Sequence, residues 1–398
     1  MEHLKTSRRT LLQLASLAGM QASATCASVA QPEWPIVEGP DTPKLCLGSG
    51  DGGTPLPGGP FADTAKDEIP PSYRRIKQLG VDYIMGGGIG GPLPWQEANI
   101  RAAIERAKRA GLTLYIAMIS IPGDVIYGRP GRDAGIENVI KSIQAAGAAG
   151  LPVVEYNWYA HRAMEGYFEE TGRAGLGHTG FDYERLVEVD GKKVPFKDLP
   201  PLPNVGAWTL EQMWANITYF LKAVIPAAEK AGVRLALHPN DPPAPISRGS
   251  QQIMGTVAGW KKLISIVDSP SNGITFDPGV TREMGEDPVE VCRYFASRDR
   301  INHAHYRNVR VIRPYERYTE VAPDEGQVDM FGVMLELVRN KYTRMVNPEH
   351  PRGLDYDRER PGFRTLYPGG GGYAGHVFNV AYARAMLQAA LSLRGKRL

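Results

Sequence analysis

The chain has 398 residues, of which 42% are hydrophobic, and its formal net charge at neutral pH is only +3. A charge this small argues against nucleic acid as a partner, and three cysteines are too few for a disulfide framework or a thiolate metal cluster. Apart from its N-terminus, the composition is that of a soluble globular chain without repeats, charge blocks or a membrane anchor.

The N-terminus predicts an export signal. Paired arginines, Arg8 and Arg9, precede a short apolar run, and Ser28-Val29-Ala30 offers a small-x-small cleavage site. This layout is typical of a twin-arginine signal, so we set residues 1–30 apart from the fold and expect a periplasmic or extracellular protein. The alternative is a disordered basic start in which the arginines occur by chance. Removal of the segment takes away three basic residues and one acidic residue, which lowers the formal charge from +3 to +1.

After the signal, short β-rich runs alternate with segments of helical spacing. The eight runs are 45–50, 81–87, 112–120, 151–158, 233–240, 273–279, 301–308 and 344–350. An Ala-Gly pair of the kind that ends a helix stands before several of them, and His376–Leu393 supplies the eighth helix. The alternation predicts a (β/α)₈ TIM barrel, α/β in class, as one domain over 31–398. An open doubly wound sheet is the alternative, because a sequence does not reveal strand order.

One connection is much longer than the others. Tyr159–Thr209, rich in glycine, proline and aromatic residues, separates the fourth strand from its helix, where a few residues are usual. Such an insertion at the C-terminal rim of a barrel predicts a lid over the active site. A surface excursion or a contact within a homo-oligomer is the alternative.

The last four predicted strands each finish on a polar residue: His238, Asp277, His305 and Glu349. Side chains at the C-terminal ends of barrel strands point into the active site. A single histidine there is more often structural, but four such residues on consecutive strands indicate a metal site. Their nitrogen and oxygen donors suit a divalent ion, with Mn²⁺ favoured over Fe²⁺, Co²⁺, Mg²⁺ or Zn²⁺.

Two glycine-rich stretches carry less weight. Residues 86–91 satisfy G-x-G-x-x-G, but they follow the second strand of a barrel pattern and no acidic residue ends the next strand, so a dinucleotide site is disfavoured. Residues 368–376 (PGGGGYAGH) are better explained as a rim loop before the last helix than as a phosphate cradle.

Several blocks of the chain resemble the mannonate dehydratases, metal-dependent barrel enzymes of sugar-acid catabolism. The similar blocks are SIPGDVIYGRPGRDAGIENVIKSIQAAGAAGLPVVEYN, MWANITYFLKAVIPAAEKAGVRLALHPNDPP, NGITFDPG, INHAHYRNVR, GQVDM and NPEH. The resemblance runs from about Thr113 to the C-terminus. It implies a hydro-lyase that removes water from D-mannonate, a small-molecule sugar acid, to give 2-dehydro-3-deoxy-D-gluconate, normally with Mn²⁺.

The same resemblance assigns roles to residues. It places the metal ligands on the four strand-end residues named above, and an acid/base residue on His350. Elimination of water needs such groups, because a weakly acidic proton is removed and a poor leaving group departs. Arg307 and Asn308, after His305, are candidates to bind the substrate, as is Asn157 at the end of the fourth strand. A structural ion pair for the arginine and a supporting role for His350 are the alternatives.

The chain also departs from the family pattern. The family usually has cysteine in place of Asp277, aspartate in place of Glu349 and arginine in place of Asn347. A catalytic tyrosine is expected in a Pro-Gly-Tyr context, where this chain has Phe363, and the nearest substitute is Tyr373. These departures leave the substrate open.

Two other functions stay open for these reasons. The Asp, His, Glu succession on the last three strands is also found in xylose isomerase-like sugar isomerases and epimerases, which have a metal-bridging carboxylate in place of His238. The second of these functions is that of a sugar-binding barrel that retained its metal site without catalysis.

Overall fold

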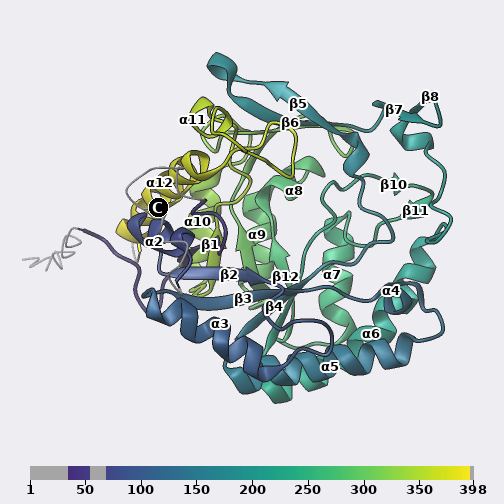
Figure 1. Ribbon diagram of the computed structural model, residues 1–398, viewed down its shortest axis with the longest axis horizontal. Coiled ribbons are helices and arrows are strands. Elements are labelled where there is room, and N and C mark those ends of the chain that lie inside the picture. Colours follow the sequence, from purple (N-terminus) through teal and green to yellow (C-terminus); the bar gives the residue numbers. More distant parts are fainter. Residues whose placement is uncertain (1–34, 54–68, 395–398) are drawn as a thin grey trace, which may run out of the picture. The chain divides into compact units, whose positions relative to one another are not determined.

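The structure is a computed structural model that describes residues 35–53 and 69–394 (Figure 1). The predicted export signal lies outside the described residues. The chain divides into two units, Met1–Ile36 and Val37–Leu398, and the second contains every described helix and strand. None of the described helices has the length and apolar character needed to cross a membrane.

Eight parallel strands form a closed barrel in the order β1-β16-β13-β12-β9-β4-β3-β2. Their bounds are β1 Lys44–Gly48, β2 Tyr83–Gly87, β3 Thr113–Ile119, β4 Val153–Tyr156, β9 Arg234–Leu237, β12 Asn272–Phe276, β13 Ile301–His305 and β16 Met345–Asn347. Each lies within or overlaps one of the eight predicted runs, so the barrel is confirmed and the open sheet is excluded.

Helices surround the barrel strands (Figure 1). They are α2 Pro71–Gln78, α3 Glu97–Arg109, α4 Gly123–Tyr127, α5 Arg132–Ala149, α6 Leu210–Ala231, α7 Val257–Ile266, α8 Pro278–Glu283, α9 Pro288–Ala296, α10 Met330–Arg339, α11 Asp355–Arg358 and α12 Tyr373–Ser392. Helix α6 shows how the sequence sets their limits. Thr209 and Gln212 form a capping box at its start, and Gly232, with φ of 68°, ends it in the left-handed conformation.

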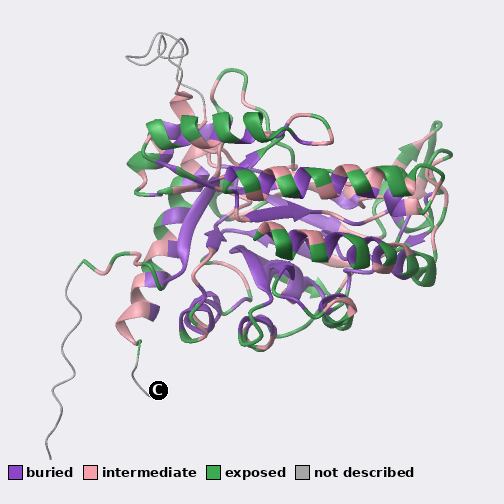
Figure 2. Cartoon of the chain, turned by 90° about the horizontal axis from the view of Figure 1, so that it is seen from below, coloured by how far each residue is buried: buried purple, intermediate pink, exposed green. Residues whose placement is uncertain are grey.

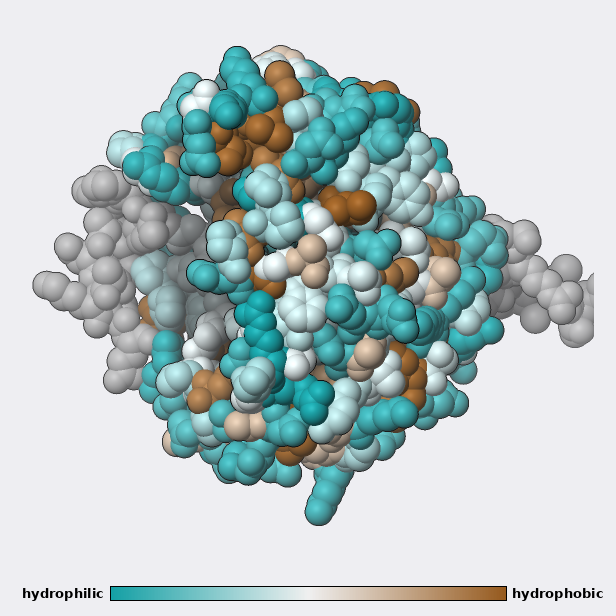
Figure 3. Space-filling view, turned by 90° about the vertical axis from the view of Figure 1, so that its right-hand side faces the viewer, coloured by the Kyte–Doolittle hydropathy of each residue, from teal (hydrophilic) through white to brown (hydrophobic). Residues whose placement is uncertain are grey.

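Burial differs between the barrel strands and the surrounding helices (Figure 2). Most residues of the barrel strands are buried, whereas helices such as α3 and α6 bury one face and expose the other. One large hydrophobic cluster joins barrel strands and helices, and a smaller one contains Tyr167, Phe181, Phe196 and Tyr318. On the face that carries β7, β8, β10 and β11, hydrophilic residues predominate and hydrophobic ones lie in separate groups (Figure 3).

The long insertion is not a structureless loop. It contains β5 Tyr167–Thr171 and β6 Gly177–Asp182, and the hairpin β7 Leu186–Val189 with β8 Lys192–Pro195. Strands β5 and β6 join β14 Asn308–Arg313 and β15 Arg317–Val321 in an antiparallel sheet of order β14-β15-β6-β5. A separate short pair, β10 Ile246–Ser247 and β11 Ser250–Gln251, follows β9. The segment after β4 is therefore tied to the hairpin that directly follows β13.

Candidate active site

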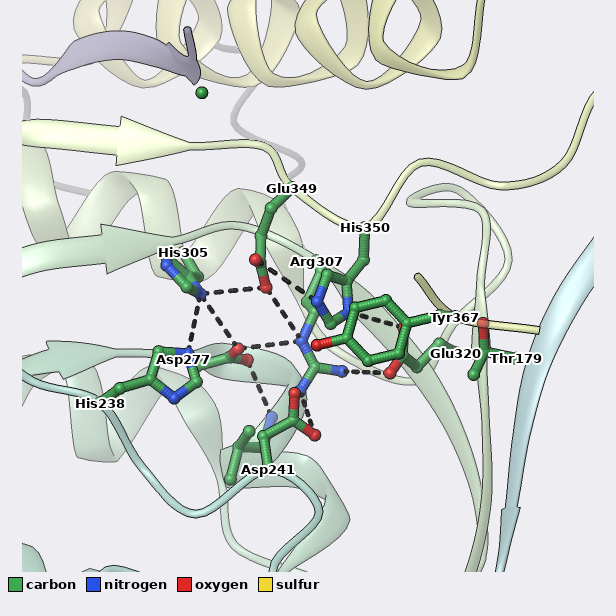
Figure 4. A network of polar contacts seen from close by, with 12 residues as sticks. Thr179, His238, Asp241, Asp277, His305, Arg307, Glu320, Glu349, His350 and Tyr367 are labelled. Carbon is green, nitrogen blue, oxygen red and sulfur yellow. Dashed lines mark hydrogen bonds and ion pairs between the residues drawn. The ribbon is translucent and has the colours of Figure 1, made fainter. Parts of the chain in front are cut away.

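Four side chains at the ends of neighbouring barrel strands meet at one point (Figure 4). His238 follows β9, Asp277 follows β12, His305 ends β13 and Glu349 stands two residues after β16. Nδ1 of His305 lies 3.0 Å from Oε1 of Glu349, 3.3 Å from Nε2 of His238 and 3.6 Å from Oδ2 of Asp277. The closed barrel thus brings together the four residues that the sequence singled out as metal ligands.

The donor atoms of His238, Asp277 and His305 lie within 4.8 Å of one another, a spacing that suits a divalent ion, and Glu349 lies beside His305. An ion with bonds of about 2.1 Å holds adjacent donor atoms about 3 Å apart. Nδ1 of His238 lies 2.7 Å from the carbonyl oxygen of Pro239, which can only accept, so the lone pair of Nε2 is free to face the cluster. Within the described chain, the buried Oε1 of Glu349 makes no hydrogen bond. A cation would satisfy it.

Arg307 lies beside the cluster and is surrounded by carboxylates. Its Nε is 2.9 Å from Oδ2 of Asp277, and one Nη is 2.8 Å from Oε1 of Glu283. Further carboxylates lie within 4 Å of it: Asp241, Glu320 and Glu349. The residue is 3% exposed. Arg307 therefore balances the negative charge of the site, and the hydrogen bonds of its Nε and one Nη to protein carboxylates favour the structural ion pair over the predicted substrate contact.

His350 stands next to the cluster in a constrained position. Its backbone has φ of 48°, a left-handed conformation that non-glycine residues adopt at a cost of about 1 kcal/mol or more, often at functional sites. Nδ1 lies 2.8 Å from Oε2 of Glu320, and Nε2 lies 3.4 Å from Oε2 of Glu349. Burial opposes protonation of the ring, but these two carboxylates outweigh it and raise the pKa of His350.

Tyr367, in the loop between α11 and α12, packs against His350. The two rings are 4.5 Å apart, and an Nη of Arg162 donates to the Tyr367 hydroxyl oxygen at 2.6 Å. The Arg162 Nε donates to the carbonyl of Asp241 at 2.7 Å. Because the arginine donates, the phenolic hydrogen stays available for another acceptor. Burial raises the pKa of Tyr367, so its hydroxyl stays protonated.

A cavity of about 390 Å³ opens over these groups. Its lining includes the predicted ligands His238, His305 and Glu349, together with His350, Tyr367, Arg162, Arg352, Asp241, Asn157 and Asn347. Asn157 is thus placed where a substrate-binding residue was predicted. Asn347, the position at which the family has arginine, is 3% exposed and lines the same cavity.

Four predicted residues do not line this cavity: Asp277, Arg307, Asn308 and Tyr373. Asp277 and Arg307 are buried in or beside the cluster, whereas Asn308 and Tyr373 have other surroundings. The amide of Asn308 donates to the carbonyl of Pro323 at 2.9 Å, and its Oδ1 accepts from the backbone N–H of Val328 at 2.9 Å, so it holds the rim hairpin together. Tyr373 begins α12 and lines a neighbouring cavity, with its hydroxyl 3.4 Å from the carbonyl oxygen of Arg75. In contrast to our expectation, Tyr367 is the tyrosine next to His350.

The glycine-rich rim loop before α12 is also explained. The Asp357 carboxylate accepts from the backbone N–H groups of Gly372, Ala374 and Gly375 at 2.8 to 3.0 Å. These are the donors that a phosphate would have needed. The loop therefore serves as a helix start that is capped from within the chain.

Sequence reasoning missed other members of the site. Glu320, on β15, and Arg162, in the insertion, carry no signal of their own, because nothing in a rim segment tells which way it folds. Arg352, whose guanidinium contacts Glu320 at 3.0 Å and Thr179 at 2.8 Å, follows the NPEH block closely. Glu155 was readable as a lone charge inside the apolar strand LPVVEYNW.

Comparisons with known proteins indicate one family. The family model described as D-mannonate dehydratase (UxuA) matches residues 66–392. The chain is 30% identical over 328 residues to mannonate dehydratase of Thermotoga maritima, which covers 73% of this chain and 88% of the relative. It is also 30% identical over 306 residues to mannonate dehydratase of Lactococcus lactis subsp. cremoris, which covers 68% of this chain and 82% of the relative.

Solved structures include a protein of the same name and others that share only the barrel fold. Mannonate dehydratase from Streptococcus suis serotype 2 superposes with a TM-score of 0.71 at 27% identity, over 89% of this chain and 96% of that chain. D-psicose 3-epimerase superposes with a TM-score of 0.51 at 14% identity, over 87% of this chain and 99% of that chain. The second likeness shows the barrel fold alone.

Proposed function

Because the chain belongs to the mannonate dehydratase family of metal-dependent hydro-lyases, we propose that it dehydrates D-mannonate or a closely related sugar acid to 2-dehydro-3-deoxy-D-gluconate or its counterpart. One observation carries the proposal beyond the family. His238, His305 and Glu349 of the strand-end cluster line the same cavity as His350, which pairs with Glu320, so the proposed metal site and the proposed proton donor would face the same space.

His238, Asp277, His305 and Glu349 would hold the divalent ion, and their mixed donors favour Mn²⁺. When bound, the ion would stabilise the negative charge that develops on the substrate as a proton leaves the carbon beside the carboxylate. The carboxylate of Asp277 also accepts from the backbone N–H of Val280 at 2.9 Å, and Arg307 holds its other oxygen. These contacts fix the orientation of the ligand before any ion binds.

His350 is the group that we assign to the leaving hydroxyl. Its Nδ1 is held by Glu320, so its Nε2 is the nitrogen that can give a proton to the substrate. In the reaction, a base would take the proton from C2, the C3–O bond would break, and the hydroxyl would leave as water with a proton from His350. The resulting enol would tautomerise to the 2-keto-3-deoxy acid, and the proton taken from C2 would return to His350 through solvent, so that the net change is the loss of one water. Tyr367 and Arg162 line the same cavity and are placed to bind hydroxyl and carboxylate groups of the substrate.

Three features support a lid role for Tyr159–Thr209. Arg162 of this segment lines the cavity, and its Thr179 contacts Arg352 at 2.8 Å. Strands β5 and β6 also pair into the sheet with β15, the strand that carries Glu320. The insertion would therefore close the cavity and hold the partner of His350 in place.

Epimerisation of a sugar remains the competing reaction, since the barrel and an Asp, His, Glu succession are shared with those enzymes. Family membership favours dehydration over it, and the likeness to the epimerase structure extends only to the fold. Mass spectrometry of the Mn²⁺-loaded protein with D-mannonate and other hexonates tests the proposal. A product lighter by one water is expected, and intact acids throughout would contradict it. Turnover of any hexonate would also exclude the sugar-binding alternative.

We further propose that the protein is exported by the twin-arginine route. The paired Arg8 and Arg9, the short apolar run and the cleavage site at Ser28–Ala30 support this location. Export of a folded chain would allow the metal to be loaded in the cytoplasm.

A further inference from the structure

Directly beneath the four strand-end residues, the barrel interior contains a second set of polar groups. Glu155 on β4, Thr275 on β12 and His303 on β13 are fully buried. The neighbouring interior positions are apolar or weakly polar: Cys46, Ile116, Val153, Ala236 and Met345. A carboxylate in such surroundings is destabilising unless other groups compensate for its lost hydration, so its presence calls for a structural or functional reason.

The Glu155 carboxylate faces three groups. Its Oε2 lies 2.9 Å from Nδ1 of His303, and its Oε1 accepts from the Thr275 hydroxyl at 3.0 Å. The same Oε1 lies 3.7 Å from Nε2 of His305. That nitrogen is buried and makes no hydrogen bond in the part of the chain that the structure describes. Glu155 therefore spans the space between a purely internal histidine and the histidine at the centre of the cluster.

The two nitrogens of His305 have different surroundings. Nδ1 faces His238, Asp277 and Glu349, whereas Nε2 faces Glu155. An imidazole binds a cation through the nitrogen that lacks a hydrogen, so the other nitrogen must carry it. A carboxylate only accepts, and thus favours the hydrogen on Nε2. In His238 the carbonyl of Pro239 has the same effect on the nitrogen away from the cluster.

We propose that Glu155 is a positioning residue, which keeps His305 in the tautomer and orientation that present Nδ1 to a divalent ion. The inference rests on the metal site of the proposed function but not on the substrate or the reaction. It predicts that Glu155 sets the affinity for the metal although it does not bind it. The competing explanation is that Glu155 serves only as the buried partner of His303 and stabilises the barrel.

The test is Mn²⁺ affinity, measured on chelator-treated protein by the electron paramagnetic resonance signal of free Mn²⁺. Glu155→Gln keeps the size of the side chain and removes its charge, and we expect the dissociation constant to rise about 10- to 100-fold. Thr275→Val is the matched control, because it removes the other hydrogen bond to the same oxygen without touching His305. We expect its dissociation constant to stay within about threefold of the wild-type value.

Wild-type affinity in Glu155→Gln, together with a lower melting temperature of the metal-free protein, would overturn the proposal in favour of the purely structural role. If Glu155→Gln does not fold, Glu155→Asp is the second variant. It keeps the negative charge, but its side chain is shorter by one methylene, so the carboxylate lies farther from Nε2 of His305. Weaker Mn²⁺ binding in that variant is then expected, and unchanged binding would overturn the proposal. Failure of the proposed reaction is distinguishable, since a wild-type protein that binds Mn²⁺ but dehydrates no hexonate leaves this comparison intact.

Discussion

Nδ1 of His350 lies 2.8 Å from Oε2 of Glu320, although the two residues come from different parts of the rim. Glu320 belongs to β15, in the sheet that the long insertion completes, and His350 follows directly on Glu349 at the end of the barrel (Figure 4). The contact therefore joins the proposed proton donor to the sheet that contains β5 and β6 of the insertion. Burial raises the pKa of the Glu320 carboxyl, but the positive charges of His350, Arg307 and Arg352 outweigh this effect and lower the pKa to about 2, so the carboxylate is ionised.

Glu320→Gln tests this pair. Loss of the charge is expected to lower kcat by about 10- to 100-fold, as for other residues that orient a functional histidine. The pKa of His350 should also fall, because burial lowers it and one of the carboxylates that raises it is gone. The alkaline limb of the pH profile of kcat/KM, where the protonated ring is lost, should then move to lower pH. Glu316→Gln, the same change at an exposed ion pair of the hairpin, is the control. An unmoved limb in Glu320→Gln would contradict the assignment.

Tyr367 and Tyr373 form a second matched pair of variants. Tyr367→Phe removes the hydroxyl that faces the cavity and Arg162 but keeps the ring against His350, and we expect kcat/KM to fall by at least about tenfold. Tyr373→Phe removes a hydroxyl in the neighbouring cavity and should change kcat/KM by less than about twofold. Steady-state kinetics with the same sugar acid compares them. The reverse order of effects would restore the original prediction for Tyr373.

The difference between these two tyrosines shows what the sequence could predict. Barrel strands were readable because apolar runs of strand length alternate with helical periodicity, and the polar residues that end them, such as His238 and His305, follow from the geometry of the fold. Tyr367 and Glu320 stand in rim segments, whose direction depends on contacts between distant parts of the chain. Spacing along the chain favoured Tyr373, but the loop before α12 turns Tyr367 toward His350 instead.

Arg307 was predictable in position but not in partner. It follows His305, so its place near the cluster was expected, yet the carboxylates that occupy it come from α8, β15 and the segment after β9. The sequence alone left open a structural ion pair or a substrate contact. The structure favours the ion pair, because Glu283 and Asp241 lie within 4 Å of the Arg307 guanidinium. Their positions along the sequence do not reveal this proximity.

Metal removal tests the cluster. The purified protein should contain about one divalent ion per chain, and His305→Ala should release it, because that change deletes the central donor. Asp277→Asn is preferable to Asp277→Ala, since the residue also accepts from Val280 at the start of α8 and pairs with Arg307. Metal content by mass spectrometry provides the measurement. Full occupancy retained in both variants would reject these ligands.

Export can be tested without the enzyme. A reporter fused to residues 1–35 should reach the periplasm of a bacterial host, and the double change Arg8→Lys with Arg9→Lys should stop it, because the twin-arginine route depends on the guanidinium pair. Fractionation of the cells gives the result. Continued export of the lysine variant would show that the two arginines are incidental.

The most direct test of the central claim follows the fate of the substrate hydroxyl. Dehydration and epimerisation both begin with removal of a proton beside a carbonyl or carboxylate, and they diverge in what happens next. The Mn²⁺-loaded protein is incubated with D-mannonate, other hexonates and several ketoses in D₂O, and the products are followed by NMR and mass. We predict a 2-keto-3-deoxy acid from a hexonate, with kcat lowered about 10²- to 10⁴-fold in His350→Ala. Deuterium in an intact epimer, with no dehydrated product from any acid, would contradict the account.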